Sequence, residues 1–312
     1  MMRLVLLGSL LLAAASLPTT GQDPFVYIRT GLGVIVVEVA QDKAPVTAAN
    51  FLKYVDAKFY DGAVFYRTVT MANQPTDKVK IEVIQGGELP DVICYPPIRL
   101  ERTSVTGLKH LDGTISIARN GPDTATASFF ICIGDQPELD FGGKRNPDGQ
   151  GFAAFGRVVY GMETVKKIQR SPADGQALKP PVGIIAAGRR TGPDRIAVQH
   201  VLVAFRGSIP DAKVTRTRDE AQTLASEIFE RAKKGEDFDK LVKNHTDDEY
   251  PGIYRMTNFG LPFSKENGEY PRAGMVWSFG EVGFGLPVGG IGLAVYDPQN
   301  SKYGWHIIKR LE

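Results

Sequence analysis

The chain has 312 residues, of which 43% are hydrophobic and 23% charged, values that are ordinary for a globular protein. This length is enough for two domains, each with a sizeable core. The 37 basic and 35 acidic side chains leave a formal charge of +2, which provides no field for a polyanion and excludes nucleic acid as an expected partner.

The N-terminal stretch MMRLVLLGSLLLAAASLPTTGQ places one arginine before an apolar run, followed by small residues and a proline. This pattern predicts a secretory signal peptide over residues 1–21, with cleavage after Ala15 or Gly21. A hydrophobic tail or anchor is the alternative. Later in the chain nothing approaches about 18 unbroken apolar residues. We therefore expect an exported protein, periplasmic or secreted, with no membrane span in its mature form.

From residue 24 to 190 the chain is rich in short strands separated by loops containing Gly, Pro and Asp. Eight strands and two helices predict a mainly β fold, a closed eight-stranded barrel with two capping helices, because closure removes sheet edges. A barrel this small is filled by its own side chains, so a binding site must lie on the outer wall. The candidate strands are FVYIRT, GVIVVEV, AVFYRTV, KIEVIQ, GTISIAR, SFFICIG, FAAFGRVV and VGIIAAG, and the candidate helices are VTAANFLKYVD and METVKKIQ.

The strand SFFICIG is apolar on both faces. Phe129 and Phe130 must point to opposite sides of it, and barrel closure buries one side only. An aromatic wall left outside usually contacts a partner or ligand; a loop folded over it is the alternative. The cysteines Cys94 and Cys132 have no neighbours spaced for a metal site. Export would permit a disulfide between them, although the apolar surroundings of Cys132 favour free thiols.

Residues 191–195 read as a polar linker with Gly and Pro, and the pattern changes after it. IAVQHVLVAF predicts a strand, and Thr217 with Glu220 forms a capping box that begins a helix. A shorter helix over DFDKLVKNH and a final strand, YGWHIIKR, follow. Residues 196–312 are thus expected to form a small α+β domain.

Several motifs of the first half resemble cyclophilin-type peptidyl-prolyl cis-trans isomerases. They are FYRTV (65–69), VIQGG (83–87), GTISIARNGPDTATASFFICIGDQPELD (113–140) and GFAAFGRVVYGMETV (151–165). The resemblance covers about residues 24–190 and implies an external groove that takes an X-Pro peptide bond. Unaided rotation of that bond meets a barrier of about 18–20 kcal/mol, and an enzyme can lower it without breaking a covalent bond.

The resemblance assigns the catalytic cation to Arg67, whose guanidinium would donate to the twisted amide nitrogen or steady the carbonyl oxygen. Gln85 would hold the peptide and orient that guanidinium. The remaining implied residues line the substrate pocket: Val83, Ala118, Phe130, Leu139 and Phe152.

The second half resembles parvulin-type (rotamase) prolyl isomerases over about residues 195–312. The motifs are QHVLVAF (199–205), the two predicted helices, MVWSFGEVGFGL (275–286) and GWHII (304–308). The resemblance implies a second, unrelated isomerase fold in tandem, and within it a purely structural role for the paired histidines is the alternative to proton transfer. The implied site residues are the histidines His200 and His306, the acidic Asp248, and the pocket residues Phe259, Met275 and Phe279.

Together these features predict an exported prolyl isomerase acting on proline-containing unfolded, nascent or translocated polypeptides. The alternative is a periplasmic peptide-binding chaperone in which one or both isomerase folds are catalytically weak. Both resembled families work without a metal or organic cofactor, so none is expected. The sequence leaves the oligomeric state open.

Overall fold

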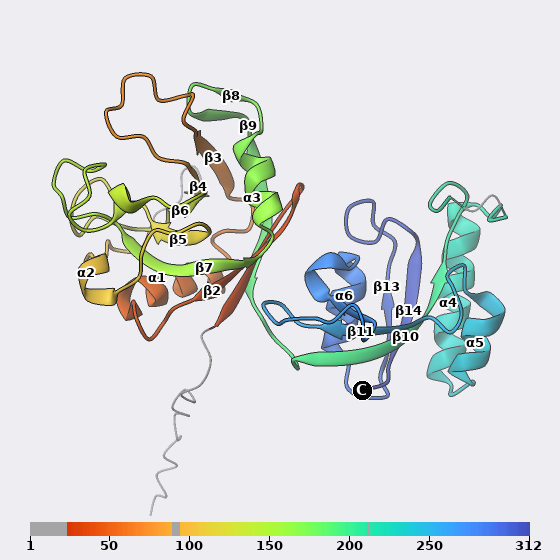
Figure 1. Ribbon diagram of the computed structural model, residues 1–312. Coiled ribbons are helices and arrows are strands. Elements are labelled where there is room, and N and C mark those ends of the chain that lie inside the picture. The colour runs from red at the N-terminus through yellow and green to blue at the C-terminus, as the bar shows by residue number, and fades with distance from the viewer. Residues whose placement is uncertain (1–23, 89–93, 211–212) are drawn as a thin grey trace, which may run out of the picture.

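The computed structural model describes residues 24–88, 94–210 and 213–312. They form two domains that lie side by side (Figure 1). The connection runs from the long strand β9 (Ala177–Arg189) into β10 (Arg195–Val203). The predicted signal peptide lies outside the described residues. Within the described part of the chain, no helix is long and apolar enough to cross a membrane.

The first domain is a closed barrel of eight antiparallel strands, which confirms the predicted fold. The strands follow the order β1-β2-β7-β5-β6-β4-β3-β9, and pairing of β1 with β9 closes the ring. A short strand, β8 (Ala173–Asp174), extends β9 as a hairpin. The remaining barrel strands are β1 (Phe25–Thr30), β2 (Gly33–Val39), β3 (Val64–Val69), β4 (Val83–Glu88), β5 (Thr114–Ile117), β6 (Phe129–Cys132) and β7 (Ala153–Tyr160).

Two helices pack on the barrel, α1 (Pro45–Asp56) and α3 (Met162–Gln169), as predicted. The structure adds α2 (Thr103–Thr106) and a 3-10 turn, η1 (Pro137–Leu139). Sequence periodicity does not detect elements this short, because they complete about one turn.

Phe129 and Phe130 lie on opposite faces of β6. Phe129 fills the barrel, where its ring meets Phe51 and Phe65 edge-on at centroid distances of 5.7 and 5.8 Å. Phe130 instead joins an apolar cluster on the outer wall that includes Val83 and Leu139. The outer aromatic face is therefore bordered by the neighbouring strand β4 and by Leu139 of η1, and together they form a pocket.

The second domain has a five-stranded sheet in the order β12-β11-β10-β14-β13. One face of β10 and β14 packs on α4 and α5, and the other face packs on α6. The predicted capping box of Thr217 and Glu220 is confirmed at the start of α4. The elements beyond β10 are α4 (Arg218–Lys233), α5 (Phe238–His245), β11 (Ile253–Thr257), β12 (Glu269–Pro271), η2 (Arg272–Gly274), α6 (Trp277–Gly285), β13 (Ile291–Ala294) and β14 (Trp305–Arg310).

The chain between β9 and β10 is fastened to the second domain. The Asn258 side-chain amide donates to the carbonyl oxygens of Thr191 and Pro193 at 2.8 and 2.9 Å. Beside this connection the two domains share an apolar cluster, here called the interdomain cluster. It consists of Phe25, Tyr27, Val34, Val36, Val159, Tyr160, Phe259, Ala273 and Trp277.

Candidate active site

The barrel groove is built by the register of three neighbouring strands. Arg67 on β3 lies opposite Gln85 on β4, and Gln85 lies opposite Phe130 on β6. Because directly opposed residues of antiparallel strands point to the same face, the cation, the amide and the aromatic ring form one row across the outer wall.

Every residue that the sequence predicts for this site lines one cavity of about 170 Å³. The predicted residues are Arg67, Val83, Gln85, Ala118, Phe130, Leu139 and Phe152. The cavity also has walls that the sequence reasoning missed, formed by Ile81, Arg119, Asn120 and Arg145. Ile81 precedes β4 at even spacing from Val83 and could have been found by alternation. The others belong to loops, where no periodic signal exists.

The guanidinium of Arg67 is held by two neutral amides. Its Nη1 donates to Gln85 Oε1 at 2.9 Å, and its Nε and Nη2 donate to Gln176 Oε1 at 2.9 and 2.6 Å. Burial, followed by the nearby charge of Arg145, lowers the pKa of Arg67, but arginine starts so high that it keeps its proton at neutral pH. Since neither amide carries a negative charge, the positive charge of Arg67 remains available to a bound peptide.

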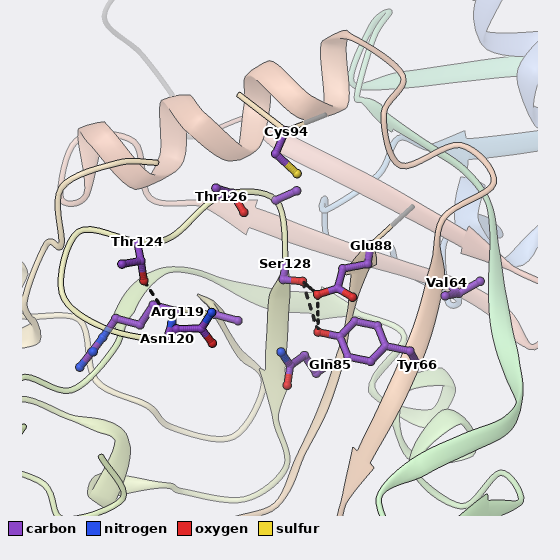
Figure 2. Close-up of a pocket in the computed structure, with 12 residues that line it drawn as sticks. Val64, Tyr66, Gln85, Glu88, Cys94, Arg119, Asn120, Thr124, Thr126 and Ser128 are labelled. Carbon is purple, nitrogen blue, oxygen red and sulfur yellow. Dashed lines mark hydrogen bonds between the residues drawn. The ribbon is translucent and has the colours of Figure 1, made fainter. Parts of the chain in front are cut away.

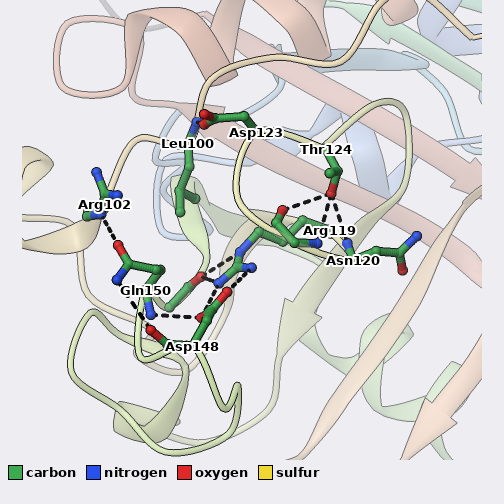
Figure 3. A network of polar contacts seen from close by, with 10 residues as sticks. Leu100, Arg102, Arg119, Asn120, Asp123, Thr124, Asp148 and Gln150 are labelled. Carbon is green, nitrogen blue, oxygen red and sulfur yellow. Dashed lines mark hydrogen bonds and ion pairs between the residues drawn. The ribbon is translucent and has the colours of Figure 1, made fainter.

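Arg119 borders the same cavity but is already paired (Figure 3). Its two terminal nitrogens donate to the Asp148 carboxylate at 2.7 and 2.9 Å, and its Nε donates to the Gly151 carbonyl at 2.8 Å. The guanidinium also lies 5.1 Å from the centre of the Phe152 ring. Arg119 therefore builds the pocket wall, with its charge neutralised by a bidentate partner.

An adjoining cavity, of about 600 Å³, continues the groove on the far side of Gln85. It shares Gln85, Ala118, Arg119 and Asn120 with the first cavity and runs toward Tyr66 and Ser128 (Figure 2). A peptide bound at Arg67 thus has room for residues beyond its proline.

Behind the pocket lies a buried chain of Ser116, His110 and Asp140. The Oγ of Ser116 is 3.0 Å from His110 Nε2, and Nδ1 of the same ring is 2.8 Å from Asp140 Oδ1. These distances resemble a hydrolase triad, but Ser116 is 0% exposed and cannot reach a substrate. The His110 ring instead lies nearly parallel to Phe130, tilted by 14°, and Asp140 directly follows Leu139. These three residues therefore hold the back of the pocket in place.

In the second domain, one cavity of about 610 Å³, here called the second cavity, brings together most of the predicted site. A chain of polar contacts crosses it. His306 Nδ1 lies 3.2 Å from His200 Nδ1, and His200 Nε2 lies 3.0 Å from Asp248 Oδ2. The Tyr254 hydroxyl donates to the same carboxylate oxygen at 2.8 Å. Met275 and Phe279 supply the apolar wall of the cavity.

The protonation states of the four side chains in this chain of polar contacts follow from their surroundings. Burial lowers the pKa of His306 to about 3, so that ring is neutral at neutral pH. The hydrogen bond from His200 lowers the pKa of Asp248, which stays ionised. An ionised carboxylate only accepts, so the proton of its bond with His200 lies on Nε2. Burial, and then the hydrogen bond to Asp248, raise the pKa of Tyr254, which therefore remains a donor.

Phe259 corrects the sequence interpretation, since the structure does not bring it to this cavity. It is 2% exposed and lies in the interdomain cluster, 5.2 Å from the Tyr27 ring. The reason is that β11 ends at Thr257, after which the chain turns toward the barrel through Gly260, at φ +77°. Sequence reasoning also missed the cavity-lining residues Leu202, Ile209, Tyr254 and Tyr270.

Cys94 and Cys132 are free thiols. Cys132 is buried in the pocket cluster, and this burial raises the pKa of its thiol. Among the described residues, no group of three or more His, Cys, Asp or Glu side chains is placed to hold a metal ion.

A closed barrel with an external arginine–glutamine groove, joined to a histidine-containing α+β domain, defines a tandem prolyl isomerase architecture. The model of the family "Cyclophilin type peptidyl-prolyl cis-trans isomerase/CLD" matches residues 25–189, and that of the "PPIC-type PPIASE domain" matches residues 185–312. The chain belongs to the cyclophilin-type peptidyl-prolyl cis-trans isomerase family, carries a PPIC-type (parvulin) domain after it, and is an enzyme of that activity.

Individual relatives cover mainly the first domain. A peptidyl-prolyl cis-trans isomerase of Acinetobacter baylyi is 34% identical over 192 residues, covering 58% of this chain and 92% of the relative. Peptidyl-prolyl cis-trans isomerase B of Escherichia coli is 36% identical over 149 residues, covering 46% and 83%. A solved cyclophilin-type isomerase of Cryptosporidium parvum aligns with a TM-score of 0.43 at 21% identity, covering 55% of this chain and 99% of that structure.

Proposed function

We propose that this isomerase is exported and acts on unfolded or newly translocated polypeptides, with the barrel groove as its main catalytic site. The observation that carries the proposal is the guanidinium of Arg67, held by neutral amides beside an apolar pocket that opens to a longer groove. A groove of this kind recognises a proline ring and an extended backbone, which unfolded chains present and folded domains mostly conceal.

The proposed mechanism is non-covalent. Val83, Phe130 and Leu139 hold the proline ring, while the peptide on its N-terminal side rotates. As resonance is lost, the amide nitrogen becomes pyramidal and able to accept a hydrogen bond, and Arg67 donates to it. Because the donor is fixed before the reaction begins, it stabilises the twisted state without the reorganisation that water would need.

The proposed substrate class is tested by refolding a protein whose slow phase is limited by proline isomerisation. The wild-type chain should accelerate that phase at substoichiometric concentration, and Arg67→Ala should accelerate it far less. A wild-type chain that rotates short peptides but leaves the refolding phase unchanged would rule out unfolded polypeptides as its substrates.

Export is supported by the single arginine, the apolar run and the small residues of the N-terminal stretch. Expression of the full chain in a Gram-negative host should give a shortened product in the periplasm or medium. Replacement of Leu11 by Arg interrupts the apolar run and should leave an unshortened product in the cytoplasm. Unshortened wild-type protein in the cytoplasm would contradict export.

A chaperone activity is the second candidate function, and it is favoured by the second cavity, which lies in the second domain. Met275, Val276 and Phe279 line that cavity, and Tyr270 at its border is 46% exposed. Such a surface can hold apolar segments without rotating a bond. If so, Arg67→Ala should suppress aggregation of an unfolded protein as well as wild type does. Loss of suppression in that variant would tie the effect to catalysis in the barrel and exclude independent holding.

A further inference from the structure

We propose that the barrel positions the prolyl pocket of the second domain, through Tyr27 and Arg29 of β1. These two residues do not touch the pocket; they act through the segment that forms its wall. The proposal rests on the proposed function in one respect, namely that the second cavity binds prolyl peptides.

The wall segment, residues 272–279, faces the barrel on one side and the cavity on the other. Ala273 and Trp277 belong to the interdomain cluster. Three residues of the same segment, Met275, Val276 and Phe279, line the cavity. A movement of the barrel-facing side chains is therefore transmitted within one or two residues to the pocket.

The barrel contacts the wall segment through an aromatic and a cation–π pair. On β1, Tyr27 and Arg29 point to the same side because they are two residues apart. The Tyr27 ring lies 5.1 Å from the Trp277 ring, edge-on, and the Arg29 guanidinium lies 4.8 Å from the centre of the same indole. Edge-on aromatic pairs and partly buried cation–π pairs both stabilise the arrangement in which they form.

Helix α6 depends on tertiary contacts, from the barrel as well as from the sheet of its own domain, because its own sequence favours a helix weakly. It begins at Trp277, carries Phe279 and contains three glycines in nine residues, WSFGEVGFG. Glycine disfavours a helix relative to alanine at interior positions. The preceding residue, Val276, makes no side-chain capping hydrogen bond. A helix with these properties forms only where tertiary contacts hold it.

A buried arginine joins the wall to the domain connection. Arg272 lies between the rings of Phe259 and Phe284, each 4.6 Å from its guanidinium carbon. It donates to Glu281 on α6 at 2.5 Å and to Asn258 at 3.0 Å. Asn258 is the residue that fastens the connection between the domains. The barrel, the connection and the pocket wall thus form one packed unit.

Hydrogen exchange in the full chain tests the positioning directly. Tyr27→Ala should speed exchange of amides in residues 275–285 about tenfold or more, including Gly280, which donates to the Val276 carbonyl. Tyr27→Phe keeps the ring and should exchange like wild type. The matched control is Tyr95→Ala, which removes another half-buried barrel tyrosine, one that packs on Tyr54 away from the interface. It should leave these amides unchanged.

The effect on the pocket is read from the Met275 methyl group by NMR. A proline-containing peptide titrated into wild type should shift this signal, and Tyr27→Ala should weaken the apparent affinity by about five- to tenfold. Arg29→Gln, which leaves the tyrosine in place, should weaken it by about two- to threefold. Isomerase activity at the barrel groove should remain within twofold of wild type in both variants, which shows that the barrel is folded.

The outcomes separate the proposals. Unchanged exchange in Tyr27→Ala, or an equal increase in Tyr95→Ala, would overturn the positioning role. Faster exchange with an unchanged affinity at Met275 would also overturn it, because the wall would then move without consequence for the pocket. A wild-type Met275 signal that no prolyl peptide shifts would remove the second cavity as a prolyl site, while hydrogen exchange would still decide whether the barrel orders its wall.

Discussion

The two candidate sites, the barrel groove and the cavity of the second domain, have opposite electrostatics. In the barrel, Arg67 presents a positive charge whose polar partners are the neutral amides of Gln85 and Gln176. In the second domain, the central charge is the Asp248 carboxylate, which already accepts from His200 and Tyr254. The first site keeps its charge unpaired for the substrate, whereas the second uses its charge to order its own side chains.

Of these two charges, the one that its partners leave uncompensated is the stronger candidate for a catalytic group. Arg119 makes the same point within one pocket: it lines the cavity beside Arg67, but a bidentate carboxylate neutralises it. We therefore expect catalysis to depend strongly on Arg67 and more modestly on the polar chain of the second domain.

The largest effect is expected from Arg67→Ala. It should lower kcat/KM of the full chain on an X-Pro peptide by about 10- to 1,000-fold, or about 1.4–4 kcal/mol of transition-state stabilisation. Arg157→Ala is the control, since it removes an exposed arginine that pairs with Glu38 outside the groove. A protease-coupled assay in which Arg67→Ala keeps the wild-type rate would remove the barrel mechanism and the contrast between the two sites.

The second domain should lose stability in acid. Burial gives His306 a pKa of about 3, whereas an unfolded histidine titrates near 6.5. Between these values the unfolded chain binds more protons, so stability falls as the pH falls, by about 2–3 kcal/mol from pH 7 to 4.5. Asp248, whose pKa is also lowered, adds to the loss below about pH 4.

Urea unfolding followed by tryptophan fluorescence measures this loss, because both tryptophans, Trp277 and Trp305, lie in the second domain. His306→Gln removes the titrating ring and should flatten the dependence on pH, whatever its stability at pH 7. An equally steep dependence in that variant would show that His306 is not responsible.

Asp248→Asn should have an intermediate effect, measured in the Arg67→Ala background so that the second domain is seen alone. The substitution keeps the shape but replaces the ionised acceptor of His200 and Tyr254. We expect the residual isomerase activity to fall about tenfold, or about 1.4 kcal/mol. Asp239→Asn is the control, because Asp239 also accepts from a tyrosine, Tyr250, outside the cavity. Equal losses in the two variants would count against a site-specific role.

The smallest effect is expected from Gln176→Ala. Its amide oxygen accepts from Nε and Nη2 of Arg67, so its loss should disorder the guanidinium and lower kcat/KM by about three- to fivefold, or about 0.6–1 kcal/mol. Gln176→Glu should lower activity at least as much, because a carboxylate pairs the charge. Gln150→Ala, which removes a bond to Arg102, should have no effect. Full activity in Gln176→Glu would show that the neutrality of the partner is unimportant.

The barrel and its cavity were predictable because their signals are local and repeated. Short apolar runs separated by loops containing Gly, Pro and Asp identified the strands, and the motifs around Arg67, Gln85 and Phe130 fall on neighbouring strands whose register places them in one row. Gln176 was not predictable, since it reaches Arg67 from 109 residues away along the chain. A loop residue at that separation carries no periodic signal.

The second domain shows where sequence reasoning stops. The structure brings His200, Asp248 and His306 into one cavity, and all three lie in or next to recognisable motifs. Phe259 does not reach this cavity, because it follows the end of β11 and its ring contacts Tyr27 of the barrel instead. The interface was invisible in the sequence because Tyr27 and Arg29 read as ordinary outer residues of a strand.

The fastened connection between the domains has a consequence for clients with several prolines. Since Asn258 ties the connecting residues Thr191 and Pro193 to the second domain, the two sites are not joined by a slack tether, and the gain from bivalent engagement depends on geometry. If both sites bind prolines, a polypeptide engages them together only when the stretch between its prolines matches the distance between the sites. The enzyme would then select clients by the spacing of their prolines, with avidity that is highest at one spacing.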